Sequence, residues 1–388
     1  MKSAYNEDSL YKLEVIKETK RWLKGTLISK EQFGAISEAN KVAFYHPNLM
    51  IRLLLFVAAA IALSGASGLL GLMFAEAGVV FLSIGAIVYG IISFVVLEKA
   101  FLKNDHFKSG VTEAVMYHAC GFIIGGVSGL SDFNSVGTIV WTCIIVFSFA
   151  GIRYLDFLTT IAAIGSFAYA LFYHLHNLGG IMQQLIPFAF ILVFTTAFLY
   201  ARMLKQKKEL RVWTNNLIVA ESLFLLLIYC GGNYFVVREL SVNLLNLQIE
   251  PGGDIPFAIL FYLLTSLIPC LYLYFGIKKK DIVLIRVSLF VLAFSAFTFK
   301  YYYSLGPPEI TLTIAGIIVF AFAMALMNYL KEMINGFTRE NLLSEKWAST
   351  NVQAFIISQT LGGNQASSSI KDAPGDGEFG GGGSTESF

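Results

Sequence analysis

Charged side chains are scarce in this sequence. Asp, Glu, Lys and Arg make up 14% of its 388 residues, whereas hydrophobic types make up 56%. A soluble globular protein carries about 25% charged and 45–50% apolar residues. A shortage of charge on this scale excludes an ordinary water-soluble core and indicates a membrane protein.

The sequence also lacks the motifs of common catalytic and metal sites. It contains no GxxxxGK[ST], no HExxH, no EF-hand loop and no clustered His/Cys ligand set. Its cysteines show no CxxC spacing and are interpreted as small buried residues; they are Cys120, Cys143, Cys230 and Cys270. We therefore predict no metal, no cofactor and no catalytic residue.

Nucleic acid is not an expected partner either. The basic stretch RMLKQKKELR, residues 202–211, resembles a nucleic-acid patch only in composition. Beside a membrane, such a stretch fits a topology signal and a contact with anionic lipid.

Long apolar runs are what the sequence has instead. Crossing a hydrocarbon layer of about 30 Å takes about 20 residues, and in lipid a continuous apolar span must be a helix. The predicted spans are 50–73, 78–97, 110–130, 135–152, 156–175, 180–201, 212–236, 255–277, 282–303 and 309–330. The predicted fold class is therefore all-α, a polytopic transmembrane helical bundle of about ten spans.

The distribution of Lys and Arg gives these spans an orientation. If both termini are cytoplasmic, every Lys and Arg except Arg238 and Lys300 falls in an inner segment or at the inner end of a span. This agrees with the positive-inside rule, and one span more or fewer would destroy the agreement. We therefore predict a multi-pass protein of the inner (cytoplasmic) membrane with both termini in the cytoplasm.

Three regions follow from the position of the spans. Residues 1–48 form a cytoplasmic helical N-terminal module, and residues 49–331 form the transmembrane helical domain. Residues 332–388 form a cytoplasmic tail, which after about residue 360 is rich in Gly, Ser and acidic residues. That composition cannot bury enough apolar surface to order a chain, so this part of the tail is predicted to be disordered.

The N-terminal module reads as two short helices. Apolar residues recur at near-helical spacing over residues 8–24, and Gly25 is a suitable C-terminal stop. Ser29 and Gln32 then form a capping box that predicts a second helix to about Asn40. Two short helices bury little apolar surface, so a docking or regulatory element is favoured over a catalytic one.

Two stretches carry a resemblance to a known family. WLKGTLISKEQFGAI, residues 22–36, precedes the first span, and FKYYYSL, residues 299–305, precedes the last. Both resemble the corresponding parts of bacterial polytopic membrane proteins in the domain-of-unknown-function 2157 group, over about residues 8–331. The resemblance implies a many-span protein of a bacterial inner membrane and brings neither an established activity nor catalytic residues.

Ionisable residues inside the spans are the candidate functional residues, because centring one in a bilayer costs at least about 2.5–3.5 kcal/mol. Depths follow from about 1.5 Å per residue, counted from the nearest basic marker. His118 and Glu221 both lie about 15 Å deep, whereas Glu113 lies about 7 Å and Arg286 about 9 Å deep. The matched depths predict a mid-membrane pair of His118 with Glu221 and a shallower pair of Glu113 with Arg286.

Each of these side chains has two interpretations. His118 and Glu221 could relay protons or bind a cation, or each could simply hydrogen-bond to a neighbouring helix. Asn215 and Asn216, almost two turns from Glu221, could line the same cavity or bond between helices. All of them are retained as one candidate intramembrane polar site.

The third span carries Gly121, Gly125 and Gly129 at the GxxxG spacing. Small residues at this spacing let helices approach closely, so we predict that the third span is central and packed through these glycines.

The aromatic stretch at the end of the ninth span predicts an interface. Lys300 lies about 30 Å along the span from Lys280, at the far boundary and too far from Glu221 to pair with it. Lys300 with Tyr301, Tyr302 and Tyr303 is therefore predicted to anchor the helix at the membrane surface.

Three classes of function remain open, with the lipid bilayer a partner in each. A transporter or channel-like protein for a small solute or ion is favoured, because the third, seventh and ninth spans carry polar groups. The alternative is a non-transporting scaffold or sensor whose residues 1–48 engage a cytoplasmic protein. The third is an intramembrane hydrolase, because Ser67 in GASG and His118 in HACG match a rhomboid-like dyad. However, Ser67 lies about 7 Å further along its span than His118.

Overall fold

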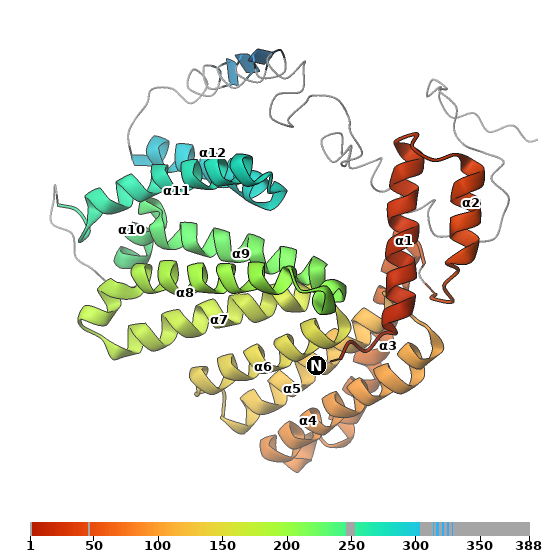
Figure 1. The fold of residues 1–388 in the computed structure, drawn as a ribbon. Coiled ribbons are helices and arrows are strands. Elements are labelled where there is room, and N and C mark those ends of the chain that lie inside the picture. Colours follow the sequence, from red (N-terminus) through yellow and green to blue (C-terminus); the bar gives the residue numbers. More distant parts are fainter. Residues whose placement is uncertain are drawn as a thin grey trace, which may run out of the picture.

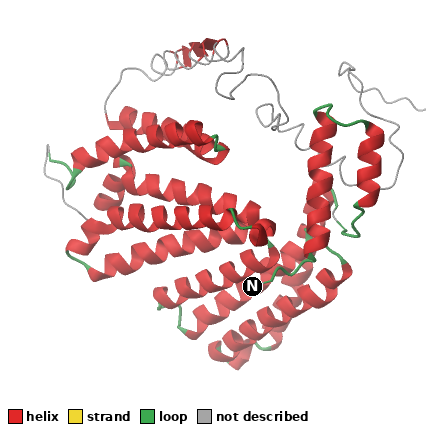
Figure 2. Ribbon diagram, in the orientation of Figure 1, coloured by secondary structure: helices red, strands yellow, loops and turns green. Residues whose placement is uncertain are grey.

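The structure is a computed structural model that describes residues 2–45, 47–245 and 253–302. It also describes a few positions of the next apolar run: 313, 316, 317, 320, 321, 324, 325 and 328. Its regular elements within these residues are all helices, as Figures 1 and 2 show. The predicted all-α class is confirmed. The rest of the predicted tenth span, 309–330, and the whole tail, 332–388, lie outside the described residues.

Two short helices form a hairpin at the N-terminus. Helix α1 (Glu7–Lys24) is capped by Asn6 and ends at Gly25, and α2 (Lys30–Ala39) follows. The Ser29 hydroxyl accepts from the Gln32 N–H at 3.2 Å, and the Gln32 side chain accepts from the Ser29 N–H at 2.9 Å. The predicted capping box is therefore confirmed, and it fixes where the second helix begins.

The remaining α-helices form a bundle, and all of them except the short α10 are long and apolar. They are α3 (Leu49–Met73), α4 (Val79–Val96), α5 (Val111–Leu130), α6 (Val136–Tyr154), α7 (Phe157–Leu178), α8 (Ile181–Lys205), α9 (Thr214–Gly232), α10 (Tyr234–Asn243), α11 (Ala258–Lys279) and α12 (Ile282–Tyr302). Among the described residues, 9 helical stretches are long and apolar enough to cross a membrane, and they correspond to the first nine predicted spans. The chain is therefore that of a multi-pass membrane protein.

The seventh span differs from its prediction at one end. It was predicted to run to residue 236, but α9 ends at Gly232 and α10 begins at Tyr234. Asn233 between them is extended, and its side chain accepts from the Val236 N–H at 3.1 Å. The asparagine therefore acts as an N-cap that starts a new helix, which an apolar run does not reveal.

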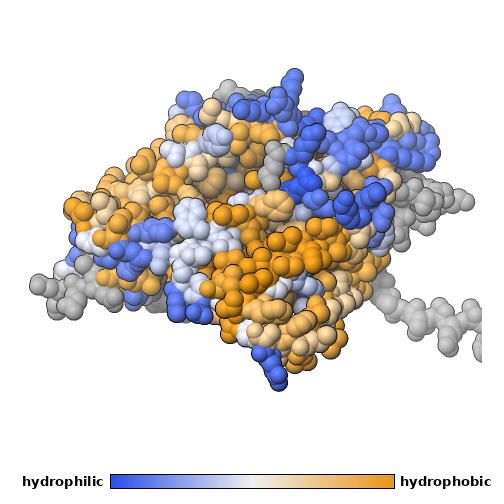
Figure 3. All heavy atoms as spheres, turned by 90° about the horizontal axis from the view of Figure 1, so that it is seen from below, coloured by the Kyte–Doolittle hydropathy of each residue, from blue (hydrophilic) through white to orange (hydrophobic). Residues whose placement is uncertain are grey.

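Two helices hold the bundle together. Helix α5 packs against α3, α4 and α6, while α9 packs against α7, α8, α11 and α12. The prediction that the third span is central is confirmed, since half of the most apolar window of α5 is buried (50%), against 0% for α3. The outer helices expose large apolar side chains, and Figure 3 shows a broad apolar area across the middle of one face, as a surface in contact with lipid should have.

The glycines that bring α4 and α5 together are only partly the predicted ones. Gly121 and Gly125 have no neighbouring atom within 4 Å of where a Cβ would stand. A Cβ on Gly126, by contrast, would lie 2.5 Å from the carbonyl oxygen of Ser83 on α4, and one on Gly129 would collide with the Ser83 hydroxyl. The contact face therefore includes Gly126 and Gly129, and the GxxxG spacing assigned the wrong face to the other two.

Candidate functional site: a polar cluster at the basic end of the bundle

Ion pairs join neighbouring elements at one end of the bundle. We call it the basic end: it is where α3 and α5 begin and where α4, α6, α8 and α11 end. The pairs that connect two elements of the bundle there are Arg52–Glu113, Arg153–Glu98, Arg202–Asp281 and Lys205–Glu221. Because each pair joins separate elements, the set ties the helix ends together.

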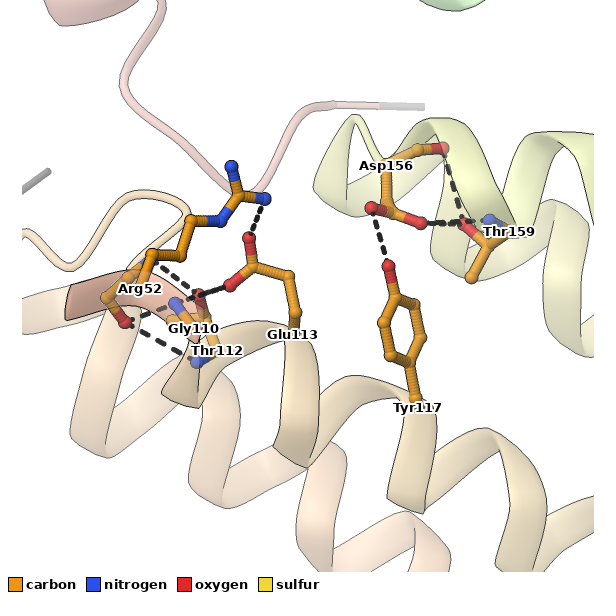
Figure 4. Close-up of polar contacts among 8 residues, drawn as sticks. Arg52, Gly110, Thr112, Glu113, Tyr117, Asp156 and Thr159 are labelled. Atoms are coloured by element: carbon orange, nitrogen blue, oxygen red, sulfur yellow. Dashed lines mark hydrogen bonds and ion pairs between the residues drawn. The ribbon is translucent and has the colours of Figure 1, made fainter. Parts of the chain in front are cut away.

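Glu113 lies at the centre of this end, in the first turn of α5 (Figure 4). One carboxylate oxygen accepts from the Arg52 guanidinium on α3. The other accepts from the Gly110 N–H and from the Thr112 hydroxyl, each at 2.8 Å. Gly110 has φ +92°, and a Cβ there would collide with the Arg52 carbonyl oxygen, so glycine is required for α3 to come this close. The carboxylate thus both caps α5 and binds α3.

Asp156 forms a second centre beside the first. It is 4% exposed and caps α7, accepting from the Thr159 N–H at 2.8 Å. The Tyr117 hydroxyl of α5 donates to the same carboxylate at 3.1 Å, as Figure 4 shows. The Asn216 side chain of α9 donates to the Asp156 carbonyl oxygen at 3.1 Å. Asp156 therefore links the two helix groups, one around α5 and the other around α9.

A small cavity lies between the two carboxylates. Its volume is about 10 Å³, room for about one water molecule. Its lining residues are Tyr5, Leu97, Lys108, Thr112, Glu113, Met116, Tyr154 and Asp156. Burial lowers the pKa of the Lys108 ammonium, and burial together with the nearby carboxylates raises the pKa of the Tyr5 hydroxyl. At neutral pH Tyr5 is thus a neutral hydroxyl beside charged groups.

Residues that precede α1 close this cavity. Tyr5 is 8% exposed, and its ring lies 4.9 Å from that of Phe107. The Ala4 N–H donates to the carbonyl oxygen of Arg153 at 2.8 Å, and the Arg153 guanidinium donates to the carbonyl oxygen of Lys2 at 2.9 Å. The N-terminal segment is therefore packed into the bundle and is not a free arm.

Glu113 pairs with Arg52, whereas Arg286 was the partner predicted from the sequence. Glu113 does lie near the end of a span, as predicted, but its cation is Arg52. Arg286 lies on α12, which packs against α9 and α11 in the other helix group. A depth count gives only the height of a residue in the membrane, and two helices at equal height need not be neighbours.

His118 and Glu221 also have separate surroundings. Glu221 is 1% exposed, and its carboxylate accepts from the Lys205 ammonium at 2.6 Å. The His118 ring lies 5.5 Å from that of Tyr89 on α4 and 4.5 Å from that of Phe122. Among the residues that the structure describes, no contact joins the histidine to the glutamate, and neither residue lines either of the two cavities found there.

Glu221 lies closer to the basic end than its depth count placed it. The count began at Arg211, but Arg211 belongs to a short 3-10 helix (Lys208–Trp213), and α9 begins only at Thr214. Glu221 is the seventh residue after Thr214, which corresponds to a rise of about 10 Å. This is why Lys205, at the end of α8, reaches it.

Asn216 forms hydrogen bonds to neighbouring helices, whereas Asn215 lies on the surface. The Asn216 amide donates to Gly151 of α6 at 3.1 Å and to the Thr160 hydroxyl of α7 at 2.8 Å. The neighbouring Asn215 is exposed. Of the two interpretations given for Asn216, the hydrogen bonds match the structural one.

The aromatic stretch lies at the end of α12 remote from the basic end. Lys300 is partly buried and Tyr301 is 59% exposed. The Tyr302 hydroxyl donates to Glu239 of α10 at 3.1 Å, so this ring also packs inside the protein. Tyr303 lies outside the described residues.

No contact among the described residues brings together Ser67 and His118, the two residues of the rhomboid-like dyad. The Ser67 hydroxyl donates to the Ser64 carbonyl oxygen of its own helix at 3.1 Å, while His118 lies against α4.

Several residues of the polar cluster were missed from the sequence. Arg52 and Lys205 look like ordinary topology markers, and Tyr5 precedes the first predicted helix. Asp156 had a usable signal, because an Asp directly before an apolar run with Thr159 three residues later is an N-cap pattern.

Comparison with known proteins adds no relative. No model of a protein family, no curated protein and no solved structure matches the chain. The likeness to the domain-of-unknown-function 2157 group therefore rests on the two sequence stretches and stays a prediction. Within the part of the chain that the structure describes, no three His, Cys, Asp or Glu side chains gather as metal ligands.

Proposed function

We propose that this protein is a membrane-embedded scaffold or sensor that presents the hairpin α1–α2 to a cytoplasmic protein. The observation that carries the proposal is that the hairpin is fastened to the basic end at its base, while large apolar side chains further along it are exposed. Figure 1 shows it standing across that end of the bundle, with α2 beyond α1.

The base of the hairpin is fixed by contacts along its first turns. Glu14 of α1 pairs with Arg211 at 3.0 Å. Leu10 and Leu13 pack against the buried cluster that contains Tyr5 and Phe107. The bundle therefore sets where the hairpin stands, and a partner that moved the hairpin would pull on the polar cluster.

The rest of the hairpin keeps apolar surface exposed. Helix α2 has no buried residue, and Leu27 in the connection is 58% exposed. On α1, Tyr11 is 49% exposed and Trp22 is 40% exposed. Trp22 and Leu27 lie close together, since the Leu27 N–H donates to the Trp22 carbonyl oxygen at 3.0 Å. Neighbouring large apolar side chains exposed outside the spans favour a surface that binds another protein.

The polar residues of the spans favour this function over transport. Glu113 and Glu221 each have a cation, and Asn216 bonds to two other helices. Charges paired in this way are compensated within the protein and need no solute to compensate them.

A photo-crosslinking amino acid at position 27 tests the proposal in native membranes. We expect a discrete adduct with one protein, and we expect Trp22→Glu to abolish it. The matched control is position 38 on α2, where the Glu38 side chain is 77% exposed and should give no adduct. Equal adducts at both positions, or none at position 27, would contradict the proposal.

Transport of an ion or small solute is the second candidate, and a buried carboxylate oxygen of Glu221 favours it. Glu221 is almost fully buried, and its Oε1 has no hydrogen-bond partner among the described residues. An unsatisfied buried carboxylate oxygen is costly and is retained most readily where it serves a function. Glu221→Gln should then abolish an ion-dependent or solute-dependent phenotype at unchanged membrane abundance. An equal loss of abundance would assign Glu221 to packing.

A further inference from the structure

Cations at the end of α11 lie over aromatic rings of the preceding turn. The Lys278 ammonium is 5.6 Å from the centre of the Tyr274 ring, and the Lys279 ammonium is 5.7 Å from that of Phe275. Residues four apart lie on the same face of a helix, so each ring supports the ammonium above it. The two charges are therefore held side by side at the basic end.

The supporting rings face outward from the bundle. Tyr274 is 56% exposed, Phe275 is 42% exposed, and Leu271 one turn earlier is 41% exposed. On a membrane-spanning helix, this is a surface that lipid chains cover. Aromatic rings at the end of a span lie at the level of the headgroups, so the two ammoniums lie at that level as well.

Nearby carboxylates do not neutralise these lysines. Asp281, the first acidic residue after them, pairs with Arg202 at 2.8 Å and accepts from the Val283 N–H at 2.9 Å. No ion pair found between the described residues includes Lys278 or Lys279. Among the described residues, the charges of Lys278 and Lys279 therefore have no carboxylate that neutralises them.

We propose that Lys278 and Lys279 bind the phosphate of an anionic phospholipid whose acyl chains lie along the exposed face of α11. Two ammoniums match one or two phosphate charges, and the apolar face below them matches the chains. A free phosphate would use the charges and leave that face unused, so a lipid fits the whole surface.

The chain offers a matched pair of lysines for comparison. Lys99 and Lys103 also lie at the basic end, after α4, but the residues four before them are Val95 and Lys99. These two lysines carry the same charge as Lys278 and Lys279, but no cation–π contact with an aromatic ring is found for them among the described residues. If charge alone were enough, both pairs would bind lipid equally.

The test measures phosphatidylglycerol bound to the full-length protein in detergent, by native mass spectrometry. We expect Lys278→Gln and Lys279→Gln each to weaken retention about fivefold. Tyr274→Leu with Phe275→Leu should weaken it while leaving the charge intact, and Lys99→Gln with Lys103→Gln should leave it unchanged.

Three results would overturn the proposal. Unchanged retention in the Lys278→Gln, Lys279→Gln double variant would show that these lysines do not bind the lipid. An equal loss with Lys99→Gln, Lys103→Gln would show a general effect of surface charge. Displacement of the lipid by inorganic phosphate at the same concentration as the phosphatidylglycerol would assign the site to free anions.

Discussion

Glu113 shows, at the scale of single residues, how a carboxylate is accommodated at the end of a span. It is 7% exposed, and each hydrogen-bond or ion-pair partner described for its carboxylate is a donor or a cation. Arg52 supplies the charge, while the Gly110 N–H and the Thr112 hydroxyl supply neutral hydrogen bonds. The helix N-terminus adds a favourable dipole. Removing the charge should therefore cost more here than at an exposed ion pair.

Glu113→Gln tests this expectation. It preserves the size of the side chain but leaves Arg52 without its anion, and we expect it to lower the stability of the folded protein by about 1–3 kcal/mol. The measurement is the thermal unfolding midpoint in detergent. Glu38→Gln is the control, since the Glu38–Lys41 pair is exposed and 3.7 Å apart and should contribute less than about 1 kcal/mol. Equal effects would contradict the structural role of Glu113.

Close packing of α4 on α5 is the main feature at the scale of elements. It depends on which glycines face the neighbouring backbone, and Gly125, which was predicted to do so, is adjacent in sequence to Gly126, which does. Gly126 lies against Ser83 and Ile87 of α4, whereas Gly125 has open space around it. Neighbouring residues on a helix point about 100° apart, so such a difference is expected.

Gly126→Leu should force α4 and α5 apart, because its Cβ alone would lie 2.5 Å from the Ser83 carbonyl oxygen. We expect a loss of about 1–3 kcal/mol or more, seen as a lower unfolding midpoint and a lower yield of folded protein. Gly125→Leu is the control and should be tolerated. If Gly125→Leu were the more damaging of the two, the GxxxG face predicted from the sequence would be the true contact.

The whole molecule is a bundle of two helix groups whose ends are tied together on one side. The α5 group and the α9 group meet at Asp156, Asn216 and the Trp213 indole, which donates to the Ile152 carbonyl oxygen at 2.8 Å. The N-terminal segment packs into the same end through Tyr5. The side of the membrane on which this end lies decides where the hairpin α1–α2 is presented.

Reporter fusions test the topology. The described spans place residue 302 at the end opposite the start of α3, and the predicted span 309–330 would return the chain to the first side. We expect a fusion after residue 388 to report the cytoplasm and one after residue 306 to report the opposite side. A fusion at residue 207, between α8 and α9, is the cytoplasmic control. The same side for residues 306 and 388 would refute the tenth span.

The sequence by itself determined the class, the positions of the described spans and the capping box at Ser29. Each of these depends on local pattern: apolar length, the spacing of Lys and Arg, and a hydroxyl three residues before an amide side chain. A local pattern is complete within one segment, so it can be read without knowing what lies beside that segment.

Only the tertiary structure decided which residues meet. The sequence places Glu113 near the end of its span and gives only an approximate height for Glu221, and it does not give the direction in which either side chain points around the helix axis. That direction selected Arg52 and Lys205 as partners and left His118 against Tyr89. Tyr5 and Asp156 entered the cluster in the same way, since packing brings segments far apart in the sequence to the same end of the bundle.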